Sequence, residues 1–197
     1  MPSPAAARFF RVCQKGEALT SAALRLGHRS ADRQVLLHAS LATIVAAWDQ
    51  YVRTICQDFF SVTGRLADAG FQNLHATLSL QYQQKEKKFN TPNFENSRNL
   101  IVECTGFDPY THWSWKNRRW PVARVQTFLN EVLKVRHSFA HGGTMPSYTW
   151  NVDVSGNPNL NKKAVTDIQA LLQTLVKNTD KGLSLFLKAT FIVSPPW

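Results

Sequence analysis

The sequence predicts an all-α fold, and three observations support this prediction. Apolar residues recur at steps of three and four in several long stretches, which is the spacing of one helix face. The 197 residues include only 9 Gly and 9 Pro, which favours helices over a strand-rich sandwich. Hydrophobic residues make up 44% of the chain, an ordinary share for a globular core. We therefore expect an antiparallel helical bundle.

The chain divides into a short N-terminal helical extension and one larger domain. We assign residues 1–29 to the extension, which packs on the bundle, and residues 30–197 to the bundle itself. Apolar residues between Arg8 and Leu26 predict a helix interrupted at Gly16, and residues 1–7 are expected to be loose. No repeat, low-complexity tract or linker divides the remainder.

The first half of the bundle is predicted to hold three helices. Ser30 is a suitable N-cap for a long helix that runs towards Gly64 or Gly70. Its middle is apolar nearly all round, so we expect burial on more than one side. A second helix is predicted over residues 71–89. A third starts with Thr91 and Pro92, read as N-cap and first helical residue, and ends at Gly106.

Residues 107–121, FDPYTHWSWKNRRWP, form the main predicted loop. Its aromatic residues alternate with cations, a pattern that could stack bases and hold phosphates. In the competing interpretation the tryptophans close the end of the bundle. We place at least two of its three Trp residues in the core and assign RNA contact to Lys116, Arg118 and Arg119.

The second half continues with a helix from Val122 to His141, whose apolar residues recur at helical spacing. A loop over residues 144–159 follows. Asn161 can cap the final helix, which carries a clear apolar stripe that continues beyond Gly182.

Several polar side chains lie close together at the C-terminal end of the predicted helix Val122–His141. Arg136, His137 and His141 precede a glycine pair that ends the helix. Cations at a helix C-terminus commonly cap carbonyls and pair with the dipole, which is one interpretation. A metal site is a second, but a zincin motif would need Glu where Ser138 stands. In the third, Arg136 holds phosphate oxygens and His141 moves protons.

The composition of the chain favours some classes of binding partner over others. The formal net charge of +10 favours a polyanion, RNA or DNA ahead of a membrane surface, although a basic surface can also be inert. The three Cys residues are scattered, which fits reduced thiols in a cytosolic protein. The N-terminus lacks a secretory signal, and we expect no stretch long enough to span a bilayer, so we predict a cytoplasmic protein without membrane contact.

The segment Arg-His-Ser-Phe-Ala-His-Gly at a helix end resembles the signature of HEPN domains, a family of helical bundles that includes RNA-cleaving members. Residues 36–51, LLHASLATIVAAWDQY, resemble an early helix of the branch called RiboL-PSP-HEPN. Residues 90–115, with NTPNFENSRNLIVECTGFD and the following Trp-Ser-Trp, resemble its middle. The resemblance covers most of residues 30–180 and implies a HEPN-like bundle.

The resemblance also implies a mechanism. It predicts a metal-independent RNA endonuclease without a cofactor, in which the ribose 2′-hydroxyl attacks the adjacent phosphate and leaves a 2′,3′-cyclic end. Arg136 would stabilise charge on the phosphorane, and His141 would serve as general base or acid. His137 stands where Asn is commoner in the family and would hold the phosphate or orient His141. Asp49 forms an i,i+4 pair with Arg53, for which a salt bridge is the first explanation. It is also our candidate for a supporting, orienting group.

The spacing of Arg136 and His141 predicts a homodimer. Five residues of α-helix turn through about 500°, so the two side chains would point about 140° apart. In the family two helix ends meet, which puts the active site at the dimer interface. The resemblance further implies a toxin or phage-defence effector controlled by an antitoxin or other regulatory partner. The alternative function is a non-catalytic HEPN-like module that binds RNA or a protein.

Overall fold

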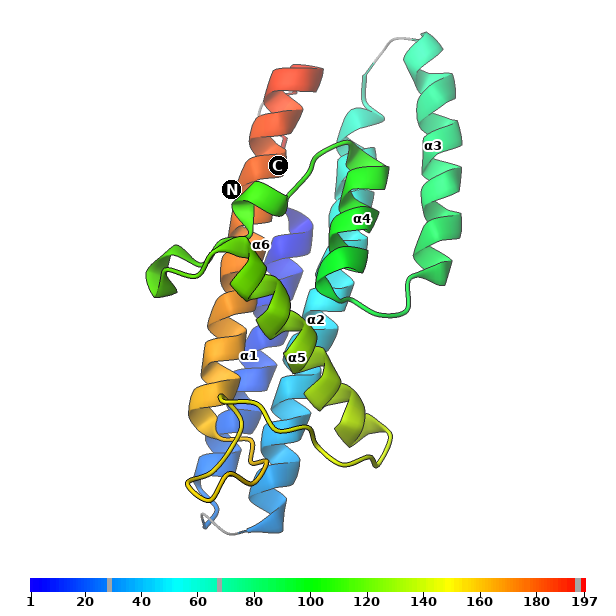
Figure 1. Cartoon of the computed structure of the whole chain (residues 1–197). Helices are drawn as coiled ribbons and strands as arrows, with labels where there is room; N and C mark the ends of the chain where they lie inside the picture. The colour runs from blue at the N-terminus through cyan, green and yellow to red at the C-terminus, as the bar shows by residue number, and fades with distance from the viewer. Residues whose placement is uncertain (28–29, 67–68, 194–195) are drawn as a thin grey trace.

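The computed structural model describes residues 1–27, 30–66, 69–193, 196 and 197. Within these ranges the chain forms six α-helices and two short 3-10 turns, with two isolated β-bridges. Successive helices alternate in direction, and the bundle is elongated along α2 (Ala31–Thr63) and α6 (Lys162–Phe191) (Figure 1). The predicted all-α bundle is therefore confirmed. The expected boundary between extension and bundle adjoins residues 28 and 29, which lie outside the described residues.

The N-terminal helix α1 (Pro4–Leu24) packs along α2 (Ala31–Thr63). It begins earlier than expected because Ser3 caps it, its hydroxyl accepting a hydrogen bond from the amide of Ala6 at 3.0 Å. It also continues through Gly16, contrary to the predicted interruption. A Cβ at this position would lie 2.8 Å from the Ile44 side chain. The glycine therefore permits a close approach of the two helices rather than ending one.

Helix α2 is the central element and spans about 50 Å. Its buried residues lie on several faces, including Trp48 and Tyr51, which are 0% and 1% exposed. One 18-residue window reaches a mean hydropathy of 1.2, so by length and composition α2 could cross a membrane. Our expectation that no stretch is long enough was therefore wrong. Within the bundle 56% of that window is buried, which is the character of a core helix.

Helices α3 (Ala69–Lys88) and α4 (Phe94–Thr105) form a hairpin on one side of α2 (Figure 1). The N-cap of α4 is Asn93, whose side chain accepts from the amide of Asn96 at 2.7 Å. Thr91 and Pro92 are thus not its cap and first residue, as predicted, but an extended connection. Gly106 ends α4 with a φ of 74°, a left-handed conformation that glycine adopts without strain.

The loop after α4 contains η1 (Tyr110–His112) and η2 (Lys116–Arg118). Trp113 and Trp115 are buried, at 0% and 4% exposure, so the placement of two tryptophans in the core is confirmed. The Trp113 indole donates to the Thr179 hydroxyl at 2.7 Å, which fastens the loop to α6 (Lys162–Phe191). Helix α5 (Val122–Ala140) then crosses the bundle obliquely in front of α2 (Figure 1).

Candidate functional site

The end of α5 gives His141 its position. The helix stops at Ala140, and His141 is the C-cap, with φ −110° and ψ 12°. Gly142 follows with a φ of 65°, and the Gly143 amide donates to the Ser138 carbonyl at 2.8 Å. The glycine pair therefore ends the helix as predicted.

A cleft of about 450 Å³ lies beside this helix end. We call it the α5 cleft. Its lining comes from α2, from the connection between α3 and α4, and from α5: Val45, Ala46, Asp49, Asn90, Thr91, Pro92, Leu133, Arg136, His137 and His141. The structure thus brings together all four side chains for which the sequence predicts a catalytic or supporting role. They come from segments almost 90 residues apart.

Arg136 and His141 share this cleft within one chain. The expected divergence of about 140° applies to a continuous straight helix. His141 is the C-cap, one residue beyond the last helical residue, and its amide still donates to the His137 carbonyl at 3.1 Å. Both side chains nevertheless line one cleft of a single chain. The homodimer stays a prediction.

The two histidines are neighbours. The ring centroids of His137 and His141 are 4.2 Å apart, with an interplanar angle of 43°. Among the described residues, no group of three or more His, Cys, Asp and Glu side chains has the arrangement of a metal site. The pair places two imidazoles, a side chain commonly used for proton transfer, side by side at the cleft.

Two polar atoms of the cleft residues are buried without a hydrogen-bond partner in the described part of the chain. They are Nε of Arg136 and Oδ1 of Asp49. Leaving a buried charged group unsatisfied is costly, so such atoms mark places where a ligand or water supplies the partner. No described carboxylate forms an ion pair with Arg136. Its guanidinium is therefore available for an anion.

Asp49 combines the two roles that the sequence left as alternatives. Its Oδ2 accepts from Nε of Arg53 at 3.2 Å, the predicted i,i+4 pair. Its Oδ1, beside the cleft, has no hydrogen-bond partner among the residues that the structure describes. One side of the carboxylate is thus held by a structural contact while the other is free to accept a hydrogen bond.

Arg53 also holds the connection between α3 and α4, part of which lines the α5 cleft. Its guanidinium donates to the Glu86 carbonyl at 2.7 Å and to the Phe89 carbonyl, and it lies 4.8 Å from the centre of the Phe89 ring. The Trp48 indole donates to the Pro92 carbonyl at 3.0 Å. Two α2 side chains therefore fix the segment Asn90–Pro92 that closes the cleft.

A family model for RiboL-PSP-HEPN matches residues 17–184, which is most of the chain. The protein belongs to the RiboL-PSP-HEPN family. Searches of curated proteins and of solved structures returned no match. The matched range covers α2 to α5 entirely and therefore includes every residue of the α5 cleft. At the family level, a HEPN domain indicates a nuclease or another RNA-related function.

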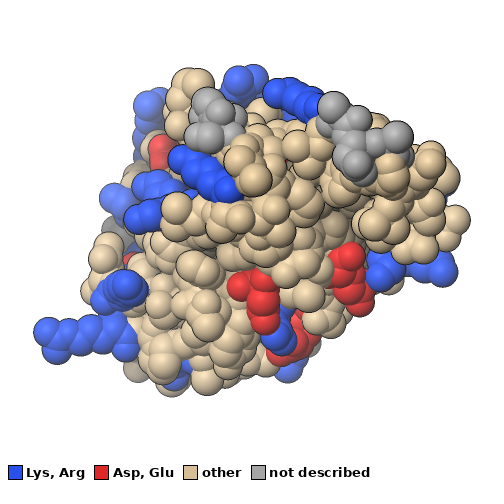
Figure 2. All heavy atoms as spheres, turned by 90° about the horizontal axis from the view of Figure 1, so that it is seen from above, with Lys and Arg blue, Asp and Glu red and all other residues tan. Residues whose placement is uncertain are grey.

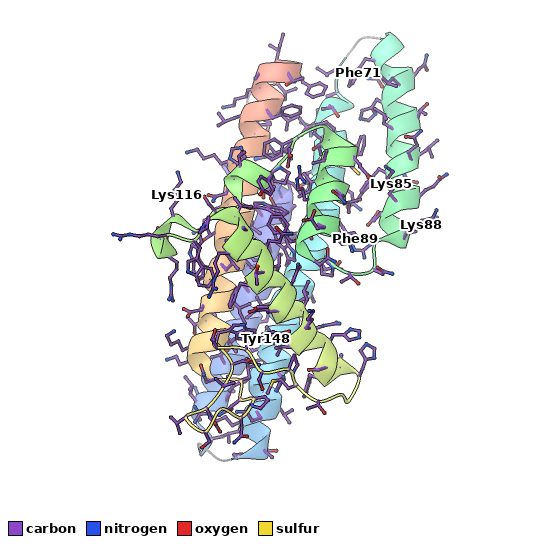
Figure 3. The ribbon with its side chains drawn as sticks, in the orientation of Figure 1. Phe71, Lys85, Lys88, Phe89, Lys116 and Tyr148 are labelled. Carbon is purple, nitrogen blue, oxygen red and sulfur yellow. The ribbon has the colours of Figure 1, made fainter. Side chains whose placement is uncertain are left out.

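The basic loop of this HEPN domain lies apart from the cleft. Lys116, Arg118 and Arg119 precede the N-terminus of α5, whereas the cleft lies at its C-terminus, about 28 Å away along 19 residues. Figure 3 shows Lys116 on one side of the bundle and, on the other, Lys88 and Phe89, which directly precede the cleft residue Asn90. Arg118 is not free, since it pairs with Asp167 and lies 5.3 Å from the Trp115 ring.

Sequence reasoning missed the residues that complete the cleft, namely Asn90, Thr91, Pro92 and their anchor Arg53. Periodicity identifies helices, but it does not show which connection folds against which helix end. One signal was available, because Asn93 has the side chain of a preferred N-cap and stands three residues before Asn96. Reading Asn93 as the cap would have left residues 90–92 as an extended segment.

Proposed function

We propose that this protein is a metal-independent RNA endonuclease that works at the α5 cleft. One observation carries the proposal. The cleft gathers two adjacent imidazoles, a guanidinium and a carboxylate, and within the described ranges the guanidinium has no ion-pair partner and one carboxylate oxygen is unpaired. These are the groups that phosphodiester cleavage needs when no metal assists it, because charge must be stabilised and two protons must move.

The proposed reaction is an internal transfer at phosphorus. The 2′-oxygen of a ribose forms a bond to the adjacent phosphorus while the bond from phosphorus to the 5′-oxygen of the next nucleotide breaks. One base removes the proton of the 2′-hydroxyl, and one acid protonates the departing 5′-oxygen. The products are a 2′,3′-cyclic phosphate and a 5′-hydroxyl, and nothing is oxidised or reduced.

The roles follow from the chemistry of each side chain. Arg136 contacts two non-bridging phosphate oxygens through its planar fork, which stabilises the charge that develops in the transition state. His141 is the principal proton carrier. His137, with its ring centroid 4.2 Å away, either supplies the second proton transfer or holds the phosphate.

Asp49 acts as a positioning residue in this proposal. Its Oδ2 is fixed by Arg53, so its Oδ1 presents a hydrogen-bond acceptor in a constant direction. An acceptor of this kind orients an imidazole by receiving its N–H, or it orients the attacking hydroxyl.

The proposal includes partners. We expect a homodimer in which the α5 ends of two chains meet and supply a second set of side chains. Lys116, Arg118 and Arg119 would guide RNA by charge, with Arg118 exchanging its Asp167 partner for phosphate. An enzyme that cuts RNA must be restrained in its host, so we include a regulatory partner such as an antitoxin. Growth arrest on expression, relieved by His141→Ala, would support the toxin or defence role.

The direct test uses purified protein and mixed RNA in EDTA. We expect fragmentation by the natural protein and none by His141→Ala at the same concentration. If the natural protein binds RNA and leaves it intact under all conditions, the function is that of a binding module and the endonuclease proposal fails.

A further inference from the structure

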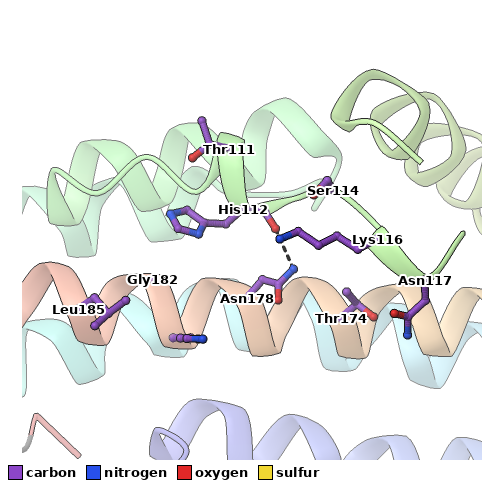
Figure 4. A pocket seen from close by; sticks show the side chains of 10 residues that line it. Thr111, His112, Ser114, Lys116, Asn117, Thr174, Asn178, Gly182 and Leu185 are labelled. Carbon is purple, nitrogen blue, oxygen red and sulfur yellow. Dashed lines mark hydrogen bonds between the residues drawn. The ribbon is translucent and has the colours of Figure 1, made fainter. Parts of the chain in front are cut away.

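A second cleft, of about 420 Å³, lies on α6 beside the loop that precedes α5. We call it the α6 cleft. It runs between the segment Thr111–Asn117 and the α6 residues Thr174–Leu185 (Figure 4). Because this loop leads into the N-terminus of α5, the α6 cleft and the α5 cleft lie towards opposite ends of that helix, which is about 28 Å long.

The α6 cleft is built by specific contacts. The Asn178 side chain donates to the His112 carbonyl at 2.9 Å, which ties η1 to α6. At Gly182 a Cβ would stand 2.6 Å from the Phe107 ring and 3.3 Å from the His112 ring. Only glycine lets the loop approach the helix this closely. The cleft is therefore a fixed feature of the packing.

The residues that line the α6 cleft supply several hydrogen-bond donors. Lys116 and Lys181 contribute two ammonium groups, and the other polar groups include Ser114 and Asn117. Neither lysine forms an ion pair with a carboxylate of the described residues. The lining contains no Asp or Glu. Figure 4 shows Lys116 reaching along the cleft above Asn178. Ammonium, hydroxyl and amide groups without a competing carboxylate suit a phosphate.

Positive charge continues beyond the cleft. Lys177, Lys181 and Lys188 line an adjoining hollow of about 390 Å³ on α6. Its one acidic residue, Asp180, is only 7% exposed and accepts the Ser3 amide at 3.0 Å. Seen from above, Lys and Arg lie along the left and upper edges and also at the right edge, and Asp and Glu cluster near the middle of the lower edge (Figure 2). The cationic track is therefore longer than one phosphate.

We propose that the α6 cleft is an accessory site for backbone phosphates of single-stranded RNA. This proposal rests on the proposed function, because that function makes RNA the ligand. A strand whose scissile phosphate occupies the α5 cleft would place phosphates several nucleotides away against Lys116 and Lys181. The α6 cleft would then hold long substrates and discriminate against fragments too short to reach it.

The test measures binding apart from cleavage. The probe is a 12-nucleotide 2′-O-methyl RNA, which lacks the attacking hydroxyl and stays intact. The variant is Lys116→Gln/Lys181→Gln, and the matched control is Lys15→Gln/Lys87→Gln, which removes the same charge from exposed positions on α1 and α3. We expect the Kd of the first variant to rise by about five- to tenfold, and its salt slope to fall by about 1.4, or 0.7 for each lost phosphate contact.

The outcomes separate the two proposals. Equal Kd values and salt slopes for the two double variants would overturn the accessory site, whether or not the natural protein cleaves RNA. Absence of cleavage with a selective binding loss would leave the site standing and remove the endonuclease. Probes with a 5′-hydroxyl and a 5′-phosphate identify the source: an equal loss assigns internal phosphates, whereas a loss confined to the second probe overturns them in favour of a terminal phosphate.

Discussion

The two clefts at the ends of α5 differ in chemistry more than in size. The α5 cleft combines a guanidinium, two imidazoles and a carboxylate, so it contains groups that give and take protons. The α6 cleft offers mainly ammonium, hydroxyl and amide donors without a carboxylate, and its one imidazole, His112, packs with a ring-centroid distance of 5.4 Å to Phe107. The first arrangement suits reaction and the second suits binding. A basic surface alone therefore does not identify where this protein acts.

The largest expected effect comes from the proton carrier and the charge stabiliser. His141→Ala and Arg136→Ala should each lower cleavage by about 10²- to 10⁴-fold, because one removes acid–base catalysis and the other removes transition-state stabilisation. Both side chains border an open cleft, so unfolding free energies should change by less than about 1 kcal/mol. Initial rates and urea unfolding measure the two quantities. Full activity in either variant would contradict the assignment.

A smaller effect is expected at Asp49. Asp49→Asn keeps the shape of the side chain but removes the charge, and we expect kcat/KM to fall about tenfold, as for one lost hydrogen bond to a charged group. Asp32→Asn, at an exposed position of α2, is the matched control. Equal rates for the two variants would reduce Asp49 to a partner of Arg53.

Packing at the α6 cleft can be tested at its glycine. Gly182→Ala should lower the free energy of unfolding by about 1–3 kcal/mol, because the added methyl group overpacks against the Phe107 ring. Gly27→Ala should lower the free energy of unfolding by less, because an added Cβ at Gly27 would have no described neighbouring atom within 4 Å. Urea unfolding of both variants decides the point, and an unchanged midpoint for Gly182→Ala would show that the loop is not held as described.

The packing near the C-terminus of α5 should also make stability depend on pH. His38 stacks on Phe139 near the C-terminus of α5, with ring centroids 4.3 Å apart, and burial lowers the pKa of His38 below its ordinary value of 6.5. The unfolded chain then binds this proton more readily than the folded one. Stability should therefore fall as pH drops below about 6.5, by at most about 1.4 kcal/mol per pH unit from this group.

The comparison of His38→Gln with the natural protein isolates that effect. Burial raises the pKa of Asp58 and of Asp180, so these carboxyls act in the opposite sense, but they are present in both proteins. Urea unfolding between pH 7.5 and 5.5 should show a flatter dependence in the variant. Parallel curves would mean that His38 is protonated equally in both states.

The sequence was sufficient to predict the helices and the polar cluster because both are local patterns. The apolar spacing of α2 and α6 and the glycines after His141 are read directly from neighbouring residues. The wall at Asn90–Pro92 was not predictable, since it depends on Arg53 and Trp48 reaching carbonyls more than 30 residues away. The course of α1 through Gly16 depended in the same way on Ile44. Contacts between residues far apart in the sequence determine both the Asn90–Pro92 wall and the uninterrupted course of α1.

The most direct test of the account is the chemistry of the product ends. A defined RNA would be incubated with the protein in EDTA, beside the same strand carrying one 2′-deoxyribose at the preferred scissile position. We predict 2′,3′-cyclic phosphate and 5′-hydroxyl ends on the first strand and no cut at the modified position of the second, because the nucleophile is missing. Cleavage at the deoxyribose position, or activity that EDTA abolishes and zinc restores, would contradict the account.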